Sequence, residues 1–495
     1  YHTDITYQIA NGNSNFNTEF GPQSGWNNHW GWLYKIVSEA NTVLSRIPSS
    51  QLSDADKVAF EAKAKFFRAF GYRNLAYLFG GVPLITEEIT TEKVDFVRAT
   101  RQEVYAQIIS DLTFCTLNLP AITAVRDGEV SNLAAQHLLA EVYLADGQFQ
   151  KAVDAATVVI DDANTDLMVT RYGSRVSVVP GDVYWDMFQA KNQNRITANN
   201  KEAIWVIQIE TDVLGGSAVS SAQAGSFLLE RVHPPLIRDL RVNGVAPFNW
   251  PVGDYSGGRG VGFMAPSQYF INNAYDDPDN DIRNANHNFV RKYLANNPNS
   301  PLNGQLIDFA NMPANSTGTN GSVITSGNAD RSIYPYQTKS TQPFNHPAAL
   351  YDSRKQFPYQ LTGAAGGTYA DQYMFRLAET YLIRAEAYLG LNNTALAADD
   401  INVVRARSNA APVAPANVDI DYILDERMRE LGVEEKRLLT LTRLGKVFDR
   451  IKKCNPYYDG ANGGSAVQAH NNLIAIPQAQ IERNRGAVLT QNPGY

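Results

Sequence analysis

A single apolar stretch, residues 53–85, does most to limit the folds open to this chain. Ser53 is a suitable N-cap, and the GGVP sequence at residues 80–83 is typical of a helix end. Between them, apolar residues recur at steps of three and four, as on one face of a helix. That stripe consists of Phe60, Ala64, Phe67, Gly71, Leu75 and Leu78. We expect other helices to cover it on two sides and to bury Phe67 and Phe70.

Several other segments predict helices that supply this cover. Residues 30–47 carry an apolar stripe and end at Pro48, which makes them an antiparallel partner for the first helix. Residues 100–119 form another amphipathic segment. In the last third of the chain we expect helices over residues 371–389, 394–409, 419–431 and 434–450. The fold class is therefore expected to be mainly α.

Two of the predicted helix pairs share the residue spacing of a tetratricopeptide repeat. The first pair carries Ala140, Tyr143, Gly147, Phe149 and Ala152, and the second carries Ala385, Tyr388 and Ala397 in matching places. Small residues let two helices approach closely, and aromatic residues fill the space between them. Two matches among other long helices favour a tetratricopeptide-like helical-repeat scaffold.

The two repeats are separated by a long segment of different composition. Residues 171–367 are rich in Asn, Gly, Pro and Ser, and they contain one clear predicted strand at residues 202–210. We therefore divide the chain into an N-terminal helical part (1–170), a loop-rich insert with short strands (171–367) and a C-terminal helical return with an extended tail (368–495). Loops carried on a rigid frame often bind ligands, so the insert is the expected ligand-binding face.

The charge of the chain limits its partners. A net charge of −7 argues against nucleic acid, which requires clustered Lys and Arg. Only 19% of the residues are charged, whereas 25 Tyr and 21 Phe supply many rings. Such a surface suits apolar or sugar ligands better than ionic ones, although most of these rings are expected in the core.

No motif in the sequence indicates catalysis. The seven His are scattered, no GxSxG sequence occurs, and Cys115 and Cys454 cannot form a metal-ligand set. We expect a protein that is not an enzyme and needs no cofactor. A glycoside hydrolase stays an alternative, because the separation of two carboxylates is a property of the fold. Glu379, Arg384 and Glu386 are expected to form structural ion pairs between helices. Glu434 and Glu435 are neighbours in a predicted helix and are expected to be surface or salt-bridged groups.

One acidic turn leaves a metal site open. Asp276, Asp277, Asp279 and Asp281 could supply oxygen ligands at alternate positions for calcium. Pro278 and the missing downstream Glu do not fit a calcium loop. A solvated turn is the preferred interpretation, with calcium as the alternative.

The tryptophans fall into two groups. Trp30, Trp185 and Trp205 have apolar surroundings and are predicted in the core. Trp26 and Trp250 have Gly, Pro or Asn neighbours, and a ring held on such a loop can lie flat on a sugar. Tyr255 and Phe248 lie close to Trp250 in the sequence. The predicted ligand-binding residues are therefore Trp250, Tyr255, Phe248 and Trp26, and no metal ligands are predicted.

Longer phrases of the sequence resemble the SusD/RagB family. They include WGWLYKIVSEANTVL from residue 30, EAKAKFFRAFGYRNLAYLFGGVPLI from residue 61, ILDERMRELGVEEKRLLTLTRLGK from residue 423 and the closing NPGY. The resemblance implies a lipoprotein on the outer face of a Gram-negative outer membrane, with a tetratricopeptide-like scaffold and a loop-rich face that binds glycans or, in some members, peptides. It also implies a lid on a SusC-like TonB-dependent transporter, without enzymatic activity.

Two departures qualify the resemblance. The lipid-bearing Cys and first helix of the family would precede Tyr1, so the membrane anchor is inferred. The family's frequent Asp in an R-x-x-D-L run is replaced, since Arg437 is followed by Leu438, Leu439 and Thr440. The expected function is capture of an oligosaccharide at the cell surface and its delivery to the transporter. Peptide binding within the same family and a repeat adaptor for protein partners are the alternatives.

Overall fold

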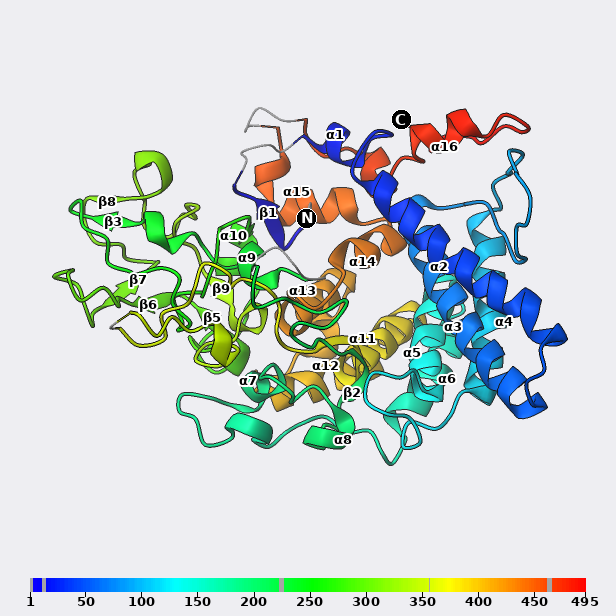
Figure 1. The fold of residues 1–495 in the computed structure, drawn as a ribbon, viewed down its shortest axis with the longest axis horizontal. Helices are drawn as coiled ribbons and strands as arrows, with labels where there is room; N and C mark the ends of the chain where they lie inside the picture. The colour runs from blue at the N-terminus through cyan, green and yellow to red at the C-terminus, as the bar shows by residue number, and fades with distance from the viewer. Residues whose placement is uncertain (1–2, 11–14, 222–226, 356, 461–464) are drawn as a thin grey trace.

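The computed structural model describes residues 3–10, 15–221, 227–355, 357–460 and 465–495, and it is mainly helical, as predicted (Figure 1). The helices are α1 (Phe16–Phe20), α2 (Trp26–Arg46), α3 (Asp54–Phe79), α4 (Arg101–Asn118), α5 (Asn132–Ala145), α6 (Phe149–Ile160), α7 (Val183–Met187), α8 (Arg195–Ala198), α9 (Leu229–Val232), α10 (Gln268–Asn272), α11 (Leu377–Gly390), α12 (Thr394–Arg407), α13 (Ile420–Leu431), α14 (Arg437–Leu444), α15 (Val447–Cys454) and α16 (Gln478–Arg483). The strands are β1 (Thr6–Gln8), β2 (Ala203–Ile207), β3 (Arg241–Val242), β4 (Met264–Pro266), β5 (Phe289–Val290), β6 (Lys292–Leu294), β7 (Leu306–Asp308), β8 (Ser316–Thr317), β9 (Tyr336–Gln337) and β10 (Gln372–Arg376).

α3 is the long helix that the apolar stripe predicts, and α2 and α4 pack against it (Figure 1). The Ser53 hydroxyl caps it by accepting a hydrogen bond of 3.2 Å from the amide of Asp56. The helix ends before Gly80, whose φ of +75° favours glycine because a Cβ is disfavoured there. The predicted start, end and two-sided packing of this helix are confirmed.

The predicted burial is wrong for the first half of the stripe. Phe60 and Phe67 are 48% and 39% exposed, although Ala64 and Gly71 on the same stripe are buried. α2 contacts α3 at Gly71. On another face of α3, the fully buried ring of Phe66 packs edge-on against Trp205 of β2. Because helical spacing puts Phe60 and Phe67 on the edge between these contacts, their rings reach solvent.

This difference predicts unequal effects for two neighbouring residues of α3. Phe66→Ala is expected to lower the free energy of unfolding by about 3–5 kcal/mol, because it leaves a cavity beside Trp205. Phe67→Ala removes a partly exposed ring and is expected to cost less than about 2 kcal/mol. Urea unfolding of the two variants in parallel measures the difference, and equal losses would contradict the burial described here.

The two predicted repeats form the helix pairs α5–α6 and α11–α12. The second pair stacks on the first, since α6 packs against α11 through an apolar cluster that includes Ala152 and Ile383. The approach is closest at Gly390, where a Cβ would lie 2.6 Å from the Phe149 ring. The chain between the repeats thus leaves one continuous scaffold and returns to it.

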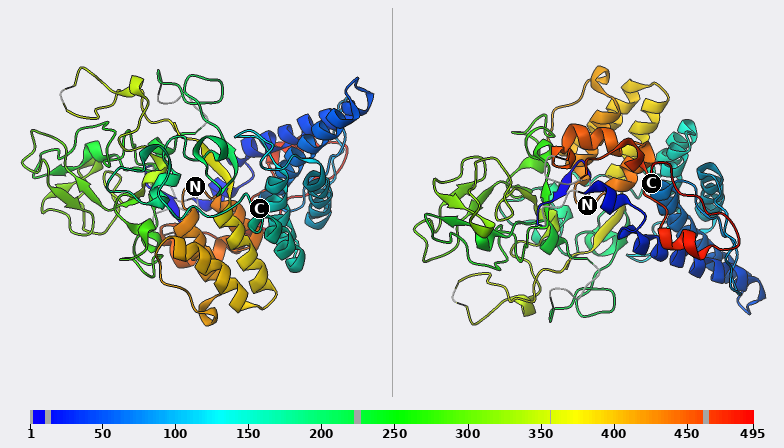
Figure 2. Two further views of the ribbon diagram at one scale, coloured as in Figure 1. Left: turned by 90° about the horizontal axis from the view of Figure 1, so that it is seen from below. Right: turned by 90° about the horizontal axis from the view of Figure 1, so that it is seen from above.

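Residues 171–367 form a loop-rich region on one side of this scaffold (green to yellow in Figure 1). Both views of Figure 2 show this region opposite α2–α4, with the C-terminal helices between them and to one side. Within the region, strands pair antiparallel in twos: β3 with β8, β5 with β9, and β6 with β7. The other two, β2 and β4, pair with β10 and β1 outside it. The three-part division at residues 170 and 367 stays a prediction.

Two of the predicted C-terminal helices are wrong in extent. Residues 371–389 are not one helix, because β10 occupies the first part and pairs antiparallel with β2, the strand predicted within residues 202–210. Residues 434–450 are likewise split into α14 and α15, which are separated at Gly445 with a φ of +64°. Local periodicity does not reveal the first change, because the partner of β10 lies far away in the sequence.

A buried ionic cluster ties the loop-rich region to the C-terminal helices. We call it the junction cluster; it consists of Glu202, Asp281, Arg283, Arg376, Arg405, Arg407, Glu426, Arg429 and Glu430. Arg283, from the loop-rich region, binds Glu426 at 2.6 Å and Glu430 at 2.9 Å on α13. All nine side chains are buried, so the attachment of the loops rests on charges held away from water.

The structural ion pairs predicted for the C-terminal helices are confirmed. The pairs of Glu379, Arg384 and Glu386 connect neighbouring helices, whereas Glu434 and Glu435 are paired but lie in the turn between α13 and α14, where a helix was predicted. The pairs are Glu379 with Arg427, Arg384 with Asp400, Glu386 with Arg443, Glu434 with Arg376, and Glu435 with Arg427.

The junction cluster predicts a loss of stability in acid. Burial raises the pKa of Glu426, but the charges of Arg283, Arg429 and Arg405 outweigh it and hold the pKa at about 2. A glutamate whose folded-state pKa lies below its ordinary 4.5 stabilises the fold fully above pH 4.5, and this contribution is lost as the pH falls towards 2. We expect the midpoint of urea unfolding to fall across this window, and to fall less steeply in Glu426→Gln.

Within the described residues, the structure contains no helix that combines the length and the apolar character needed to cross a membrane.

Candidate ligand-binding site

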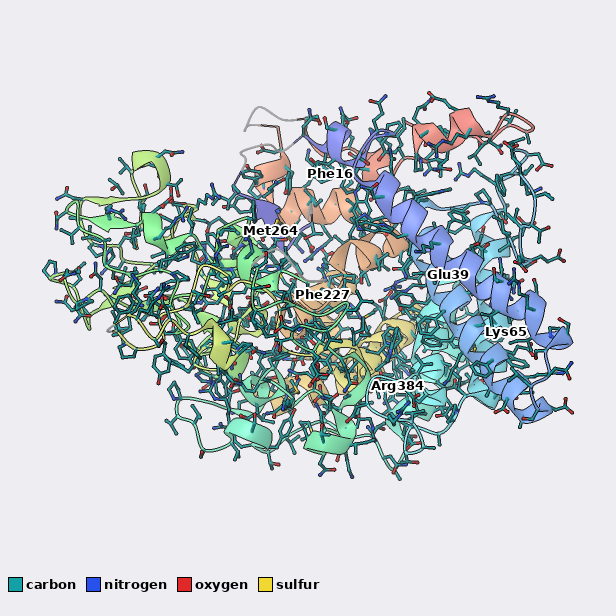
Figure 3. All side chains as sticks on the ribbon, in the orientation of Figure 1. Phe16, Glu39, Lys65, Phe227, Met264 and Arg384 are labelled. Carbon is teal, nitrogen blue, oxygen red and sulfur yellow. The ribbon has the colours of Figure 1, made fainter. Side chains whose placement is uncertain are left out.

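A crevice of about 510 Å³ opens where the scaffold meets the loop-rich region. Leu33 of α2 and Phe70 of α3 line it from the scaffold, and Leu229 of α9 and Met264 of β4 line it from the loop-rich region. Met264 lies beside β1, with which β4 pairs (Figure 3). This volume lies in the range of small-molecule sites, so the crevice can enclose part of a ligand.

Three aromatic side chains lead from solvent into this crevice. We call Trp26, His29 and Trp32 the aromatic ladder, since they stand at three-residue steps along α2. Their ring centroids are 4.6 Å and 5.1 Å apart. Trp26 and His29 line the crevice, whereas Trp32 is 61% exposed. Successive rings are tilted by 48° and 58°, so the ladder forms a stepped aromatic surface from solvent to the crevice.

Trp26 was predicted on a loop, and that placement is wrong. It is the first residue of α2, half-buried, and its indole packs beside the imidazole of His29. His29 is exposed, but partial desolvation of its imidazole lowers the pKa below its ordinary value of 6.5, so this ring is mostly neutral at pH 7. A neutral imidazole extends the ring surface of Trp26 without adding a charge.

His233 supplies a polar group inside the crevice. Burial lowers its pKa to about 4, so the imidazole is neutral at physiological pH. Neutral imidazole has one N–H donor and one acceptor nitrogen, which match a sugar hydroxyl. Sequence reasoning missed His233, because a single His before Pro234 and Pro235 carries no recognisable spacing.

Apart from Lys436, the charged groups in the crevice wall are paired with one another or with buried neighbours. Arg376 binds Glu434 at 2.8 Å, and Arg437 binds Asp4 at 2.6 Å. Burial raises the pKa of Glu434, but Arg376 outweighs it and keeps the pKa below its ordinary value. Lys436 is exposed, and its Nζ donates a hydrogen bond of 3.2 Å to the Glu434 carbonyl. An ammonium has three N–H donors, so Lys436 keeps donors for a ligand.

Trp250 does not line the crevice. It lies half-buried in the loop-rich region, where its indole Nε1 donates a hydrogen bond of 3.1 Å to the carbonyl of Gly260. The guanidinium carbons of Arg238 and Arg259 lie 4.5 Å and 5.3 Å from the ring centroid. Of the four predicted ligand-binding residues, the structure places only Trp26 in the crevice.

The two residues that flank Trp250 in the sequence differ in access. Phe248 is 3% exposed and packs edge-on against Tyr293, so its prediction as a ligand contact is corrected: the ring is a core residue. Tyr255 is half-buried and contacts the ring of Phe344 edge-on. Trp250 and Tyr255 keep some accessible surface, whereas Phe248 does not.

The acidic turn at residues 276–281 is engaged by arginines. Asp276 binds Arg405 at 3.0 Å, and Asp281 binds Arg283 through both carboxylate oxygens. Asp277 accepts a hydrogen bond of 2.8 Å from the amide of Ala411. Over the part of the chain that the structure describes, no group of three or more His, Cys, Asp or Glu has the arrangement of a metal site. Because these carboxylates already bind arginines or a backbone amide, few oxygen atoms of the turn remain to bind calcium.

Comparison with known proteins places the chain in a family. The SusD family matches residues 201–495, and a family described as starch-binding and associating with the outer membrane matches residues 2–144. The chain belongs to the SusD family.

Individual relatives agree with this assignment along most of the chain. A SusD-like protein of Formosa agariphila is 24% identical over 489 residues, which cover 92% of this chain and 76% of that protein. A laminarin-binding SusD-like protein of known structure has a TM-score of 0.66 and 22% identity, covering 100% of this chain and 93% of its own. Surface glycan-binding protein A from Bacteroides thetaiotaomicron, solved in complex with laminarihexaose, has a TM-score of 0.66 and 18% identity, covering 99% and 92%. At these identities the two structures support the fold.

Proposed function

We propose that this protein captures an oligosaccharide at the bacterial cell surface and passes it to a SusC-like TonB-dependent transporter, without cleaving it. The observation that carries the proposal is the aromatic ladder leading into a crevice of about 510 Å³. Membership of the SusD family and its resemblance to glycan-binding structures support the same class of ligand. A lipid anchor upstream of Tyr1 is part of the proposal.

The rings define how tightly such a site binds. A ring that covers ~100 Å² of apolar sugar surface contributes about 2.5 kcal/mol. Two rings of the ladder then contribute ~5 kcal/mol before ordering costs, which corresponds to millimolar to high-micromolar dissociation constants. His233 and Lys436 add hydrogen bonds that orient the sugar. Binding of this strength suits capture and release at a surface where glycan is abundant.

Calorimetric titration with laminarihexaose and a panel of other neutral oligosaccharides tests the binding step. We expect at least one of them to bind and none to release new reducing ends during incubation with the protein. A protein that binds no glycan but retains short peptides would support the peptide-binding alternative instead. Affinity capture of the protein from native outer membranes tests the transporter, which should copurify with it.

A further inference from the structure

Two arginines lie over the Trp250 ring, and a third lies beside one of them. We call Arg231, Arg238 and Arg259 the arginine cluster. The guanidinium groups of Arg238 and Arg259 lie over the Trp250 ring, at 4.5 Å and 5.3 Å from its centroid. A Cβ on Gly366 would lie 2.6 Å from Cγ of Arg231 and 3.4 Å from Cδ of Arg259, so the stems of both side chains pass this glycine.

Carboxylates do not neutralise this cluster. The Nε and Nη1 atoms of Arg259 are buried and have no hydrogen-bond partner among the described residues. Arg231 forms no ion pair with any described side chain, and Arg238 has one loose contact, 3.5 Å to Asp239. Among the described residues, half-buried Asp239 is therefore the one carboxylate that forms an ion pair with the cluster.

The buried carboxylate nearest to the cluster is committed elsewhere. Glu230 binds the His346 imidazole at 2.6 Å and accepts a hydrogen bond of 3.0 Å from the backbone amide of Arg259. The positive φ of Gly258 lets the loop wrap this carboxylate, since a Cβ there would lie 2.5 Å from Glu230. Glu230 thus fixes the loop that carries Arg259 and leaves the guanidinium itself unpaired.

The arrangement is opposite to that of the buried arginines in the junction cluster. In the junction cluster each guanidinium binds at least one carboxylate; Arg283, for example, binds three. Around Trp250, burial and the charges of Arg231 and Arg238 lower the pKa of Arg259. The charge of Glu230 offsets part of this effect. The three guanidinium charges still exceed the charges of Glu230 and Asp239, so an anion from outside the chain would be bound favourably here.

We propose that the arginine cluster binds the anionic group of an acidic oligosaccharide, a uronate carboxylate or a sulfate ester, with Trp250 as the ring surface beside it. Guanidinium groups suit both anions, because their parallel N–H donors match two oxygens. α9 links this site to the crevice: Leu229 and His233 at its ends line the crevice, and Arg231 between them belongs to the cluster. The inference rests on the proposed glycan-binding function and names the ligand class. It corrects, for this surface, the expectation from composition that ionic ligands are disfavoured.

Calorimetric titration of the full chain with four probes tests this proposal. The probes are trigalacturonate, its methyl ester, a sulfated galactan tetrasaccharide and laminarihexaose. We expect an acidic probe to bind at least about tenfold more tightly than the methyl ester, with the affinity falling as salt is raised. Preference for trigalacturonate or for the sulfated probe identifies the anion.

Two variants locate the binding. The double variant Arg231→Gln/Arg259→Gln is expected to lower the affinity for the acidic probe by about tenfold or more. It should not lower the melting temperature, because the arginines repel one another in the wild-type protein. A structural role would lower that temperature. Arg238→Gln, at an exposed side chain, should weaken the same probe with less risk to the fold. Arg126→Gln removes an exposed charge from the loop between α4 and α5 and serves as the control.

The outcomes separate this inference from the proposed function. Equal affinity for trigalacturonate, the sulfated probe and the methyl ester would overturn the inference, as would full binding of an acidic probe by the double variant. If laminarihexaose still binds in that case, the glycan-binding function stands without the acidic site. If none of the four probes binds, the inference fails, and the panel of neutral oligosaccharides decides the proposed function separately.

Discussion

Glu430→Gln is expected to lower the free energy of unfolding by about 3–5 kcal/mol. Glu430 is buried in the junction cluster, where its carboxylate binds Arg283, Arg376 and Arg407. Glutamine keeps the shape of the side chain but removes its charge, so three guanidinium groups lose a shared counter-ion in a place that water does not reach. Breaking a buried ion pair from one side costs more than the pair itself contributes, because the remaining charges stay desolvated.

A matched control separates this effect from the loss of any one negative charge. Glu39 forms an exposed pair with Lys35 on α2, so Glu39→Gln is expected to change stability by less than about 0.5 kcal/mol (Figure 3). Urea unfolding of both variants, followed by circular dichroism, measures the difference. Similar values for the two would mean that the charges of the junction cluster are solvated in solution.

The same variant tests how the loop-rich region is attached. Of the three arginines that bind the Glu430 carboxylate, Arg283 comes from the loop-rich region, whereas Arg376 and Arg407 belong to the scaffold. In Glu430→Gln the contact with Arg283 weakens, so limited proteolysis is expected to cut within residues 171–367 faster than in the wild-type protein. Cleavage that begins instead in α2–α4 would show that the cluster does not hold the loops.

Much of the scaffold was predictable because its signals are local. The cap at Ser53, the small residues of the two repeats and the apolar stripes each act within a few residues of the chain. For most of the long helices, these signals predicted the first and last residues to within a few positions. β10 was missed for the opposite reason: its strand depends on β2, which no local window includes.

The ionic interior was outside the reach of the same signals. Periodicity treats Arg and Glu as solvent-facing, yet α13 buries Glu426, Arg427, Arg429 and Glu430 together with its apolar residues. Their burial depends on partners from α12, β10 and the loop-rich region. Charge pairing of this kind is a property of the tertiary structure, so the sequence predicted ion pairs without predicting their depth.

The candidate site was predictable only in its residue type. Aromatic residues without apolar partners in the sequence led to Trp26 and Trp250, and the structure gives the two rings different surroundings. The ladder was missed because Trp32 and His29 become neighbours of Trp26 only once α2 is known to begin there. His233 and the arginine cluster come from the one-turn helix α9 and from short turns, where spacing carries no information about proximity.

Trp26→Ala is expected to weaken binding of a neutral oligosaccharide by about ten- to a hundredfold, since one stacked ring contributes about 2.5 kcal/mol. Trp26 is the ladder ring that both contacts His29 and lines the crevice, so its loss interrupts the surface between Trp32 and the interior. The measurement is a calorimetric titration of wild-type and variant with whichever neutral oligosaccharide binds the wild-type protein. Because Trp26 packs partly against the core, the melting temperature of the variant is recorded alongside.

Phe60→Ala is the control for this variant. Phe60 is an aromatic residue with 48% of its surface exposed, and it lies on α3 outside the crevice, so its removal should leave the affinity unchanged. Trp250→Ala is expected to leave the affinity for the neutral oligosaccharide unchanged and to lower the affinity for an acidic one, because the Trp250 ring contacts the arginine cluster. A folded Trp26→Ala protein with wild-type affinity would contradict the crevice as the site of capture. If Trp250→Ala instead lowers the affinity for the neutral oligosaccharide, its binding site lies in the loop-rich region.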